Sequence, residues 1–294
     1  MEKGFLETED GFRLSYAYYP VDNAKALIVL VHGILEHKER YEDFIMYLNA
    51  AGFSCIIHDN RGHGLSVDRK YILGHIENIE EPVNDLYTVM QYAKKKNPAL
   101  KTILFGHSFG SVIARNFLMN HDDEIDGLVL SGTVAPVPKF VTAFIGLCKL
   151  LSPITGGKYG RSRIVSLFNM TGKSAEKWIS YNKANIAATL ADPLMAMRLD
   201  NSFNICLYQM TANLSKPSLY MVANPELKIL SVTGEDDPCA GGKMGRRRTY
   251  LALKKIGYTF ITNRVYCNMM HEILNEDNHM KVYKDIVEFI NIVI

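Results

Sequence analysis

Short apolar runs alternate with longer amphipathic segments over the first 133 residues of the chain. Continuous runs rich in β-branched residues predict strands that are buried on both faces of a sheet, and apolar residues at helical spacing predict helices between them. The expected strands are 26–31, 54–58, 102–107 and 127–131, and the expected helices include 41–51, 82–96 and 114–119. This alternation predicts an α/β fold, a mostly parallel central sheet with helices on both faces.

A hairpin is expected before the alternation begins. Asp10-Gly11 lies between two segments of strand character, 5–8 and 12–18. An Asp-Gly pair between such segments is a strong signal for a tight turn between antiparallel strands.

The alternation stops after residue 133 and resumes after residue 215. Between these positions, apolar residues follow helical spacing with interrupting prolines and glycines, and no segment has a convincing strand pattern. The sheet is expected to resume with strands at 227–233 and 259–267 and helices at 245–256 and 278–294. We therefore predict a first core segment at 1–133, a helical cap insertion at 134–215 over the carboxyl edge of the sheet, and a second core segment at 216–294.

The sequence Gly106-His107-Ser108-Phe109-Gly110 lies where an expected strand meets an expected helix. A G-x-S-x-G turn requires small residues two positions before and after the serine, because strand and helix approach too closely for Cβ atoms. The turn strains the backbone of Ser108 and holds its hydroxyl at the positive end of a helix. A chance glycine-rich turn has the same five letters. The flanking strand and helix favour a nucleophilic serine.

A serine nucleophile needs a general base and an acid that orients the base. In sheets of this type the order along the chain is serine, acid, histidine. His271 follows the last expected strand, at the edge where ligand sites gather, whereas His279 is expected to be a solvated helix residue. The turn 234–238 offers three carboxylates before Pro238. The extended geometry of a residue before proline favours Asp237, with Asp236 as the alternative.

Acyl transfer also needs backbone N–H groups that stabilise the developing oxyanion. The N–H of Phe109, directly after the serine, is one expected donor. The other is the N–H of Ile34, after the strand that ends at Val31, because Gly33 allows the turn that would aim it.

Composition excludes several other classes of function. A formal net charge of +2 over 294 residues gives no electrostatic footprint for nucleic acid, and Arg246-Arg247-Arg248 is interpreted as a solvated helix turn. The five cysteines are odd in number and form no C-x-x-C pair, which argues against a disulfide framework and a zinc site. We expect no metal and no cofactor.

The cysteine usage is typical of reduced thiols in a cytoplasmic protein. The first seven residues lack the layout of a signal peptide, and no apolar run approaches the ~18 residues that span a bilayer. We therefore predict a soluble, unexported protein without a transmembrane segment.

Four blocks of the sequence resemble the serine hydrolases of the α/β-hydrolase superfamily, specifically the lysophospholipase and monoacylglycerol lipase-like branch. They are His32-Gly33-Ile34-Leu35-Glu36-His37 with Arg40-Tyr41, Asp59-Asn60-Arg61-Gly62-His63-Gly64-Leu65-Ser66, Gly106-His107-Ser108-Phe109-Gly110, and Gly234-Glu235-Asp236-Asp237-Pro238 followed by His271. The acid of the family stands three residues after the glycine, which independently selects Asp237. The resemblance covers 1–133 and 216–294, and it weakens at Asn268-Met269-Met270, where relatives usually carry a glycine-containing turn.

The resemblance implies an α/β-hydrolase fold and a catalytic triad of Ser108, Asp237 and His271. It further implies a serine carboxylic-ester hydrolase for single-chain lipid esters, a monoacylglycerol or a lysophospholipid, with contact between the cap and a membrane surface as an open possibility. An esterase or thioesterase for short-chain or aryl esters is the alternative. A non-catalytic receptor on the same fold is disfavoured because all three residues are present. Residues 143–148 and 194–197 are candidate linings of an acyl channel, or else part of the core of the cap.

Overall fold

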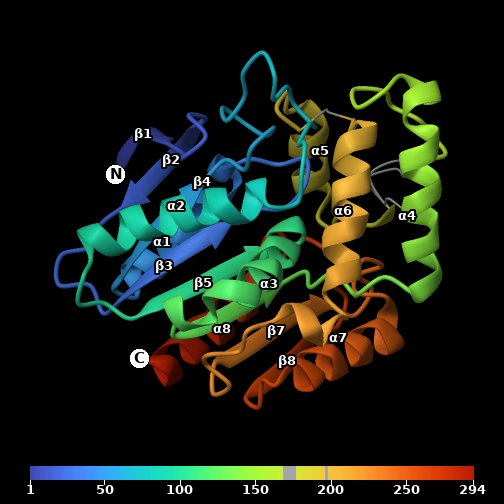
Figure 1. Ribbon diagram of the computed structural model, residues 1–294. Coiled ribbons are helices and arrows are strands. Elements are labelled where there is room, and N and C mark those ends of the chain that lie inside the picture. The colour runs from blue at the N-terminus through green and yellow to red at the C-terminus, as the bar shows by residue number, and fades with distance from the viewer. Residues whose placement is uncertain (168–176, 196–197) are drawn as a thin grey trace.

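One eight-stranded sheet runs through the protein (Figure 1). The computed structural model describes residues 1–167, 177–195 and 198–294. The strands are β1 (Glu2–Glu7), β2 (Arg13–Tyr19), β3 (Ala26–Val31), β4 (Phe53–His58), β5 (Thr102–His107), β6 (Gly127–Ser131), β7 (Lys228–Gly234) and β8 (Ile261–Tyr266). Their order is β1-β2-β4-β3-β5-β6-β7-β8, with β2 antiparallel to both β1 and β4 and all other pairs parallel. The predicted α/β fold class and the N-terminal hairpin are confirmed.

The helices of the core connect these strands in the order that the sequence pattern indicates. They are α1 (Glu42–Ala50), α2 (Glu81–Lys96), α3 (Phe109–His121), α7 (Gly242–Ile256) and α8 (His279–Val293). Short 3₁₀ turns stand at η1 (Lys38–Tyr41), η2 (Asp122–Glu124), η3 (Pro153–Thr155) and η6 (Pro217–Leu219). No helix of the described residues is long and apolar enough to cross a bilayer.

Alternate side chains of the sheet belong to two separate cores. Leu27 and Val29 of β3 pack in one core with residues of α2 and α3, while Ile28 and Leu30 pack in the other with residues of α1 and α8. Both faces of the central strands are therefore covered, which explains why these strands are continuous apolar runs instead of alternating ones.

The parallel strands bring their carboxyl ends to one edge of the sheet. In the register, His107 of β5 pairs with Ser131 of β6, and Gly234 of β7 pairs with Tyr266 of β8. Loops that follow β3, β5, β7 and β8 therefore meet at this edge, where open α/β sheets bind their ligands.

Three helices between β6 and β7 lie together beyond the ends of the strands (Figure 1). They are α4 (Lys139–Leu151), α5 (Lys183–Ala191) and α6 (Asn201–Asn213). In the described parts of 134–215, residues 134–167, 177–195 and 198–215, no strand occurs. This is consistent with a helical cap, although its boundaries remain a prediction.

The cap has a small core of its own. Val141, Ile145 and Cys148 of α4 pack with Ile205 and Tyr208 of α6. Part of the 143–148 segment thus belongs to the core of the cap. Of the other predicted channel lining, Ala196 and Met197 lie outside the described residues.

His58 is a polar residue inside the sheet. It ends β4, is completely buried, and neither ring nitrogen has a hydrogen-bond partner among the described residues. Burial, reinforced by the charge of Lys38, lowers the pKa of this imidazole to about 3. His58 therefore stays neutral in the folded chain under conditions in which an unfolded chain takes up the proton.

We expect His58→Leu to make the protein less sensitive to acid. Below the ordinary imidazole pKa of about 6.5, the unfolded wild-type chain binds a proton that the folded chain does not, so wild-type stability falls as the pH falls. At pH 5 this single site costs the wild type about 2 kcal/mol, against nearly nothing at pH 7.5. Urea unfolding of both proteins at the two pH values measures the difference. An equal loss in both proteins would contradict the assignment.

Candidate active site

Ser108 lies in a strained turn between β5 and α3. Its backbone angles are φ 53° and ψ −115°, in the left-handed half of the map that non-glycine residues rarely occupy. A Cβ at Gly106 would collide with the carbonyl group of Gly110, and one at Gly110 would collide with the carbonyl oxygen of Val31. The strain and the need for small flanking residues that the sequence predicts are both present.

The structure brings Ser108, His271 and Asp237 together. The Nε2 atom of His271 lies 2.7 Å from the hydroxyl oxygen of Ser108, and its Nδ1 atom lies 3.0 Å from each carboxylate oxygen of Asp237. Asp237 follows β7 and His271 follows β8, at the same edge of the sheet as Ser108. The alternative acid, Asp236, instead accepts a hydrogen bond of 3.1 Å from the hydroxyl of Tyr181.

The environment of His271 sets its basicity. Burial disfavours the imidazolium, but the negative charge of Asp237 and the neighbouring sulfur of Cys239 outweigh burial and hold the pKa of His271 well above its ordinary value. The ring is therefore a stronger base than a free histidine, with one nitrogen on the serine and the other on the carboxylate.

Backbone contacts from two sides fix the loop that carries His271. Asn268 has φ 55°, so asparagine adopts here the left-handed conformation that a glycine provides in relatives. From the cap, the carbonyl oxygen of Trp178 accepts from the N–H of His271 over 3.3 Å, and that of Ile179 accepts from Glu272 over 2.8 Å. The indole ring of Trp178 stands 5.4 Å from the imidazole of His271, centroid to centroid. The sequence pattern gave no signal for this contact, because it depends on how the cap folds back.

The turn after β3 passes directly beside the serine. An ideal Cβ on Gly33 would lie 3.0 Å from the Cβ of Ser108, so a side chain there would push the turn away. The Glu36 carboxylate accepts from the N–H of Gly33 and from the hydroxyl of Tyr41, the latter over 2.8 Å. This bracing keeps the backbone of Ile34 next to the nucleophile. The assignment of the Ile34 and Phe109 N–H groups to an oxyanion hole remains a prediction.

Glu36 belongs to a buried charge network behind the site. Arg40 lies 3.5 Å from Glu36 and 2.6 Å from Glu272. Burial and the nearby charge of Glu272 raise the pKa of Glu36 to about 7, against the opposing effect of Arg40. The sequence resemblance includes Glu36 and Arg40 but assigns them no role. Their spacing of four residues in a conspicuous motif is the signal that could have indicated a pair.

The three histidines near the site brace it as predicted. The Nδ1 atom of His32 lies 2.6 Å from the carbonyl oxygen of Gly33, and that of His63 lies 3.1 Å from the carbonyl oxygen of Arg61. The ring of His107 stands 5.1 Å from that of His271. Burial lowers the pKa of His63 to about 4, and burial together with the charge of His271 lowers that of His107 to about 3. Both remain neutral at physiological pH.

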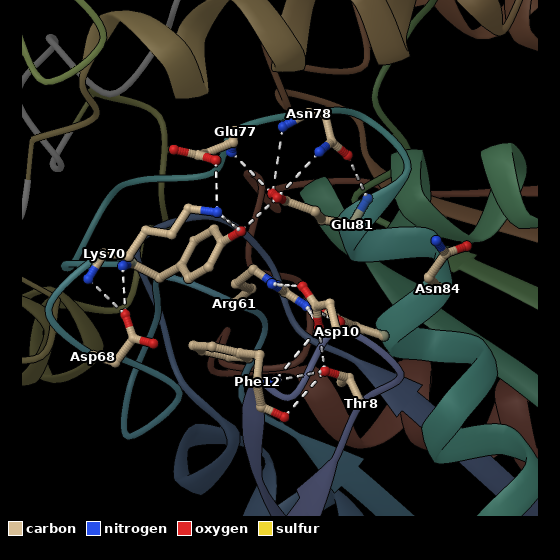
Figure 2. Close-up of polar contacts among 12 residues, drawn as sticks. Thr8, Asp10, Phe12, Arg61, Asp68, Lys70, Glu77, Asn78, Glu81 and Asn84 are labelled. Carbon is tan, nitrogen blue, oxygen red and sulfur yellow. Dashed lines mark hydrogen bonds and ion pairs between the residues drawn. The ribbon is translucent and has the colours of Figure 1, made fainter.

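The 59–66 loop is anchored through Arg61, whose side chain points toward Asp10 of the N-terminal hairpin (Figure 2). The guanidinium donates to Asp85 over 2.7 and 3.0 Å and to Asp10 over 2.6 and 3.1 Å. Its carbon also lies 4.3 Å above the ring of Phe12. Asn60 of the same loop donates its N–H to Nε2 of His32 over 2.8 Å, so the anchor supports the turn beside the serine.

Comparison with known proteins agrees with this geometry. The model of a family described as serine aminopeptidase, S33, matches residues 22–278. The chain is an α/β hydrolase of this family. The hydrolase is 25% identical over 286 residues to a monoacylglycerol lipase of Mycolicibacterium smegmatis, covering 95% of this chain and 93% of the relative. It is 23% identical over 304 residues to a probable lysophospholipase L2 of Haemophilus influenzae, covering 98% and 91% of the two chains.

Solved structures share the fold of the hydrolase. A thermostable carboxyl esterase from Bacillus coagulans superposes with a TM-score of 0.87 at 24% identity, covering 100% of this chain and 99% of the other. A monoacylglycerol lipase of Paleococcus ferrophilus superposes with a TM-score of 0.72 at 24% identity, covering 96% and 99%. The hydrolase is thus related over its full length to esterases and lipases.

Proposed function

We propose that the hydrolase is a serine carboxylic-ester hydrolase and that it acts on single-chain lipid esters, monoacylglycerols or lysophospholipids. The observation that carries this proposal is the continuous line of contacts from the Ser108 hydroxyl through the His271 imidazole to the Asp237 carboxylate. A hydroxyl 2.7 Å from a buried imidazole that is itself held by a carboxylate can be activated as a nucleophile.

The acylation half of the reaction uses all three side chains. The Ser108 oxygen attacks the ester carbonyl while Nε2 of His271 takes the hydroxyl proton, and Asp237 stabilises the resulting imidazolium. The N–H groups of Ile34 and Phe109 would stabilise the oxyanion. The tetrahedral intermediate then breaks the bond to the alcohol, which leaves with the proton from His271. Ser108 keeps the acyl group as an ester.

Water completes the cycle by the reverse sequence. His271 removes a proton from a water molecule as the water oxygen attacks the acyl carbonyl. Collapse of the second tetrahedral intermediate breaks the bond to Ser108, and His271 returns its proton to the serine oxygen. The products are a carboxylic acid and the free enzyme.

Two observations support a lipid substrate. The relatives named as a monoacylglycerol lipase and a probable lysophospholipase match nearly the whole chain. In addition, the cap exposes large apolar side chains on and beside α4, namely Phe140, Leu147, Leu150 and Ile154. Such a surface is suited to transient contact with a lipid aggregate, and this contact is part of the proposal.

We expect kcat/KM for p-nitrophenyl esters to rise with acyl length. Each methylene that enters an apolar channel adds about 0.8 kcal/mol, roughly a fourfold gain, until the channel is full. Initial rates along a series from acetate to palmitate measure this slope. Parallel assays with a monoacylglycerol and a lysophospholipid identify the preferred head group. A steep preference for acetate would support the short-chain esterase instead, and failure of a fluorophosphonate to label Ser108 would support a non-catalytic receptor.

A further inference from the structure

The sulfur of Cys239 lies beside the Asp237–His271 pair. Cys239 follows Asp237 by two residues, and its N–H donates to Oδ1 of Asp237 over 2.8 Å. One ligand atom of each residue, a carboxylate oxygen, a thiol sulfur and an imidazole nitrogen, lies within 4.8 Å of the other two. Asp237 and His271 are buried, and Cys239 is half-buried, so the turn is open to solvent on one side.

These donors fit a zinc-like divalent cation in chemistry, distance and charge. Zinc binds thiolate, imidazole and carboxylate at about 2.0–2.3 Å, so ligand atoms around a tetrahedral ion stand about 3.3–3.8 Å apart. The Nδ1 atom of His271 is already 3.0 Å from both oxygens of Asp237, and the other separations are at most 4.8 Å. A thiolate and a carboxylate together balance the two positive charges of the ion, which removes the penalty for burying it.

The absence of C-x-x-C spacing, which argues against a zinc site in the sequence, does not apply to this set. Two of the ligands are neighbours in one turn, and the third follows 32 residues after Cys239 on the adjacent strand's loop. Only the pairing of β7 with β8 brings them together.

The geometry points to a regulatory site for a thiophilic divalent cation, formed by Asp237, Cys239 and His271, at which a bound cation inhibits the hydrolase. Binding of the cation follows from the three ligands alone. The inhibition rests on the proposed function, because it requires His271 to be the catalytic base.

Inhibition follows from the tautomer that the bound cation imposes. Ester hydrolysis needs the ring proton on Nδ1, facing Asp237, and a free electron pair on Nε2, facing Ser108. A cation on Nδ1 takes the electron pair of that nitrogen and leaves the ring proton on Nε2. Nε2 then cannot accept the proton of Ser108. The thiol proton of Cys239 passes to solvent as the metal–sulfur bond forms, so we expect tighter binding at higher pH.

Binding is tested without turnover in Ser108→Ala, which retains the three ligands. Titration with cobalt(II) is expected to produce a thiolate-to-cobalt absorption in the near ultraviolet and a change in the emission of Trp178, the single tryptophan of the chain, whose ring lies 5.4 Å from that of His271. The additional change Cys239→Ser should remove the absorption and weaken binding by about 100-fold or more, since a ligand matters at least as much as its supporting contacts. The matched control is Cys267→Ser, which removes an exposed cysteine and should leave the cobalt signal intact.

Activity is tested with zinc on the wild type, Cys239→Ser and Cys267→Ser, each compared with its own zinc-free rate. We expect zinc to inhibit the wild type and Cys267→Ser, a chelator to restore both, and Cys239→Ser to resist. Equal inhibition of Cys239→Ser, or no thiolate–cobalt absorption in Ser108→Ala, overturns the site. If cobalt binds through Cys239 but the wild type hydrolyses no ester, the cation site stands and the proposed function fails.

Discussion

Ser108→Ala and Ser108→Gly both reduce ester hydrolysis by about 10⁵- to 10⁶-fold in kcat, the loss typical of removing a nucleophile that acts as one unit with its base. Neither variant has an oxygen 2.7 Å from Nε2 of His271, so neither can form the acyl-enzyme. Ester turnover and fluorophosphonate labelling measure the loss. Ser215→Ala, at an exposed serine, is the control and should keep the wild-type rate. Substantial turnover by Ser108→Ala would contradict the mechanism.

The same pair of variants should differ in stability. Serine and alanine both carry a Cβ at φ 53°, a conformation that costs about 1–3 kcal/mol for a non-glycine residue. Glycine relieves this strain but loses about 0.4–1 kcal/mol through the greater freedom of its unfolded chain. We expect Ser108→Gly to be more stable than Ser108→Ala by about 1 kcal/mol in urea unfolding, the difference of these effects. Equal stability would show that the turn stores no strain.

Asp237→Asn is expected to lower kcat by about 10⁴-fold, because an amide no longer holds the Nδ1–H tautomer or stabilises the imidazolium. The matched control is Asp236→Asn. Asp236 is the preceding residue, and its carboxylate accepts from Tyr181 instead of from His271. Steady-state rates of the two variants compare neighbouring carboxylates of which only one contacts the base. Similar losses in both would contradict the choice of Asp237.

The residual activity of Asp237→Asn should also have a different pH profile. Hydrolysis requires neutral His271, so kcat/KM rises with pH through the pKa of this residue in the free enzyme. Burial lowers this pKa, and Asp237 overcomes that effect in the wild type. Without the carboxylate, the rising limb should move to lower pH. A limb that stays in place would mean that Asp237 does not control the basicity of His271.

The core of the protein could be predicted because local sequence rules determine it. The strand 26–31 has the predicted bounds of β3, since a β-branched run between turns has few alternatives. The elbow followed from sterics alone, because Gly106 and Gly110 face backbone atoms that leave no room for a Cβ. The end of one strand and the loop after the next were enough to predict the approach of Asp237 to His271.

The contacts missed by the sequence analysis all depend on packing between distant segments. No local pattern places the carbonyl of Trp178 against the loop of His271, because the cap must first fold back onto the sheet. The same holds for Glu272, whose charge meets that of Arg40 from a different part of the chain. Apolar residues of the cap had two open interpretations, and only the packing of α4 on α6 places Ile145 in the interior of the cap.

The two hydrogen bonds from 178–179 to His271 and Glu272 have a consequence for protein engineering. Exchanging the cap for that of a relative, in order to alter substrate range, would also exchange two acceptors that hold the imidazole in place. A chimera should therefore keep 177–182 from the recipient and join the foreign helices outside this short strap. Chimeras with and without the strap, compared by kcat on one small ester, would separate the recognition of substrate from the alignment of the base.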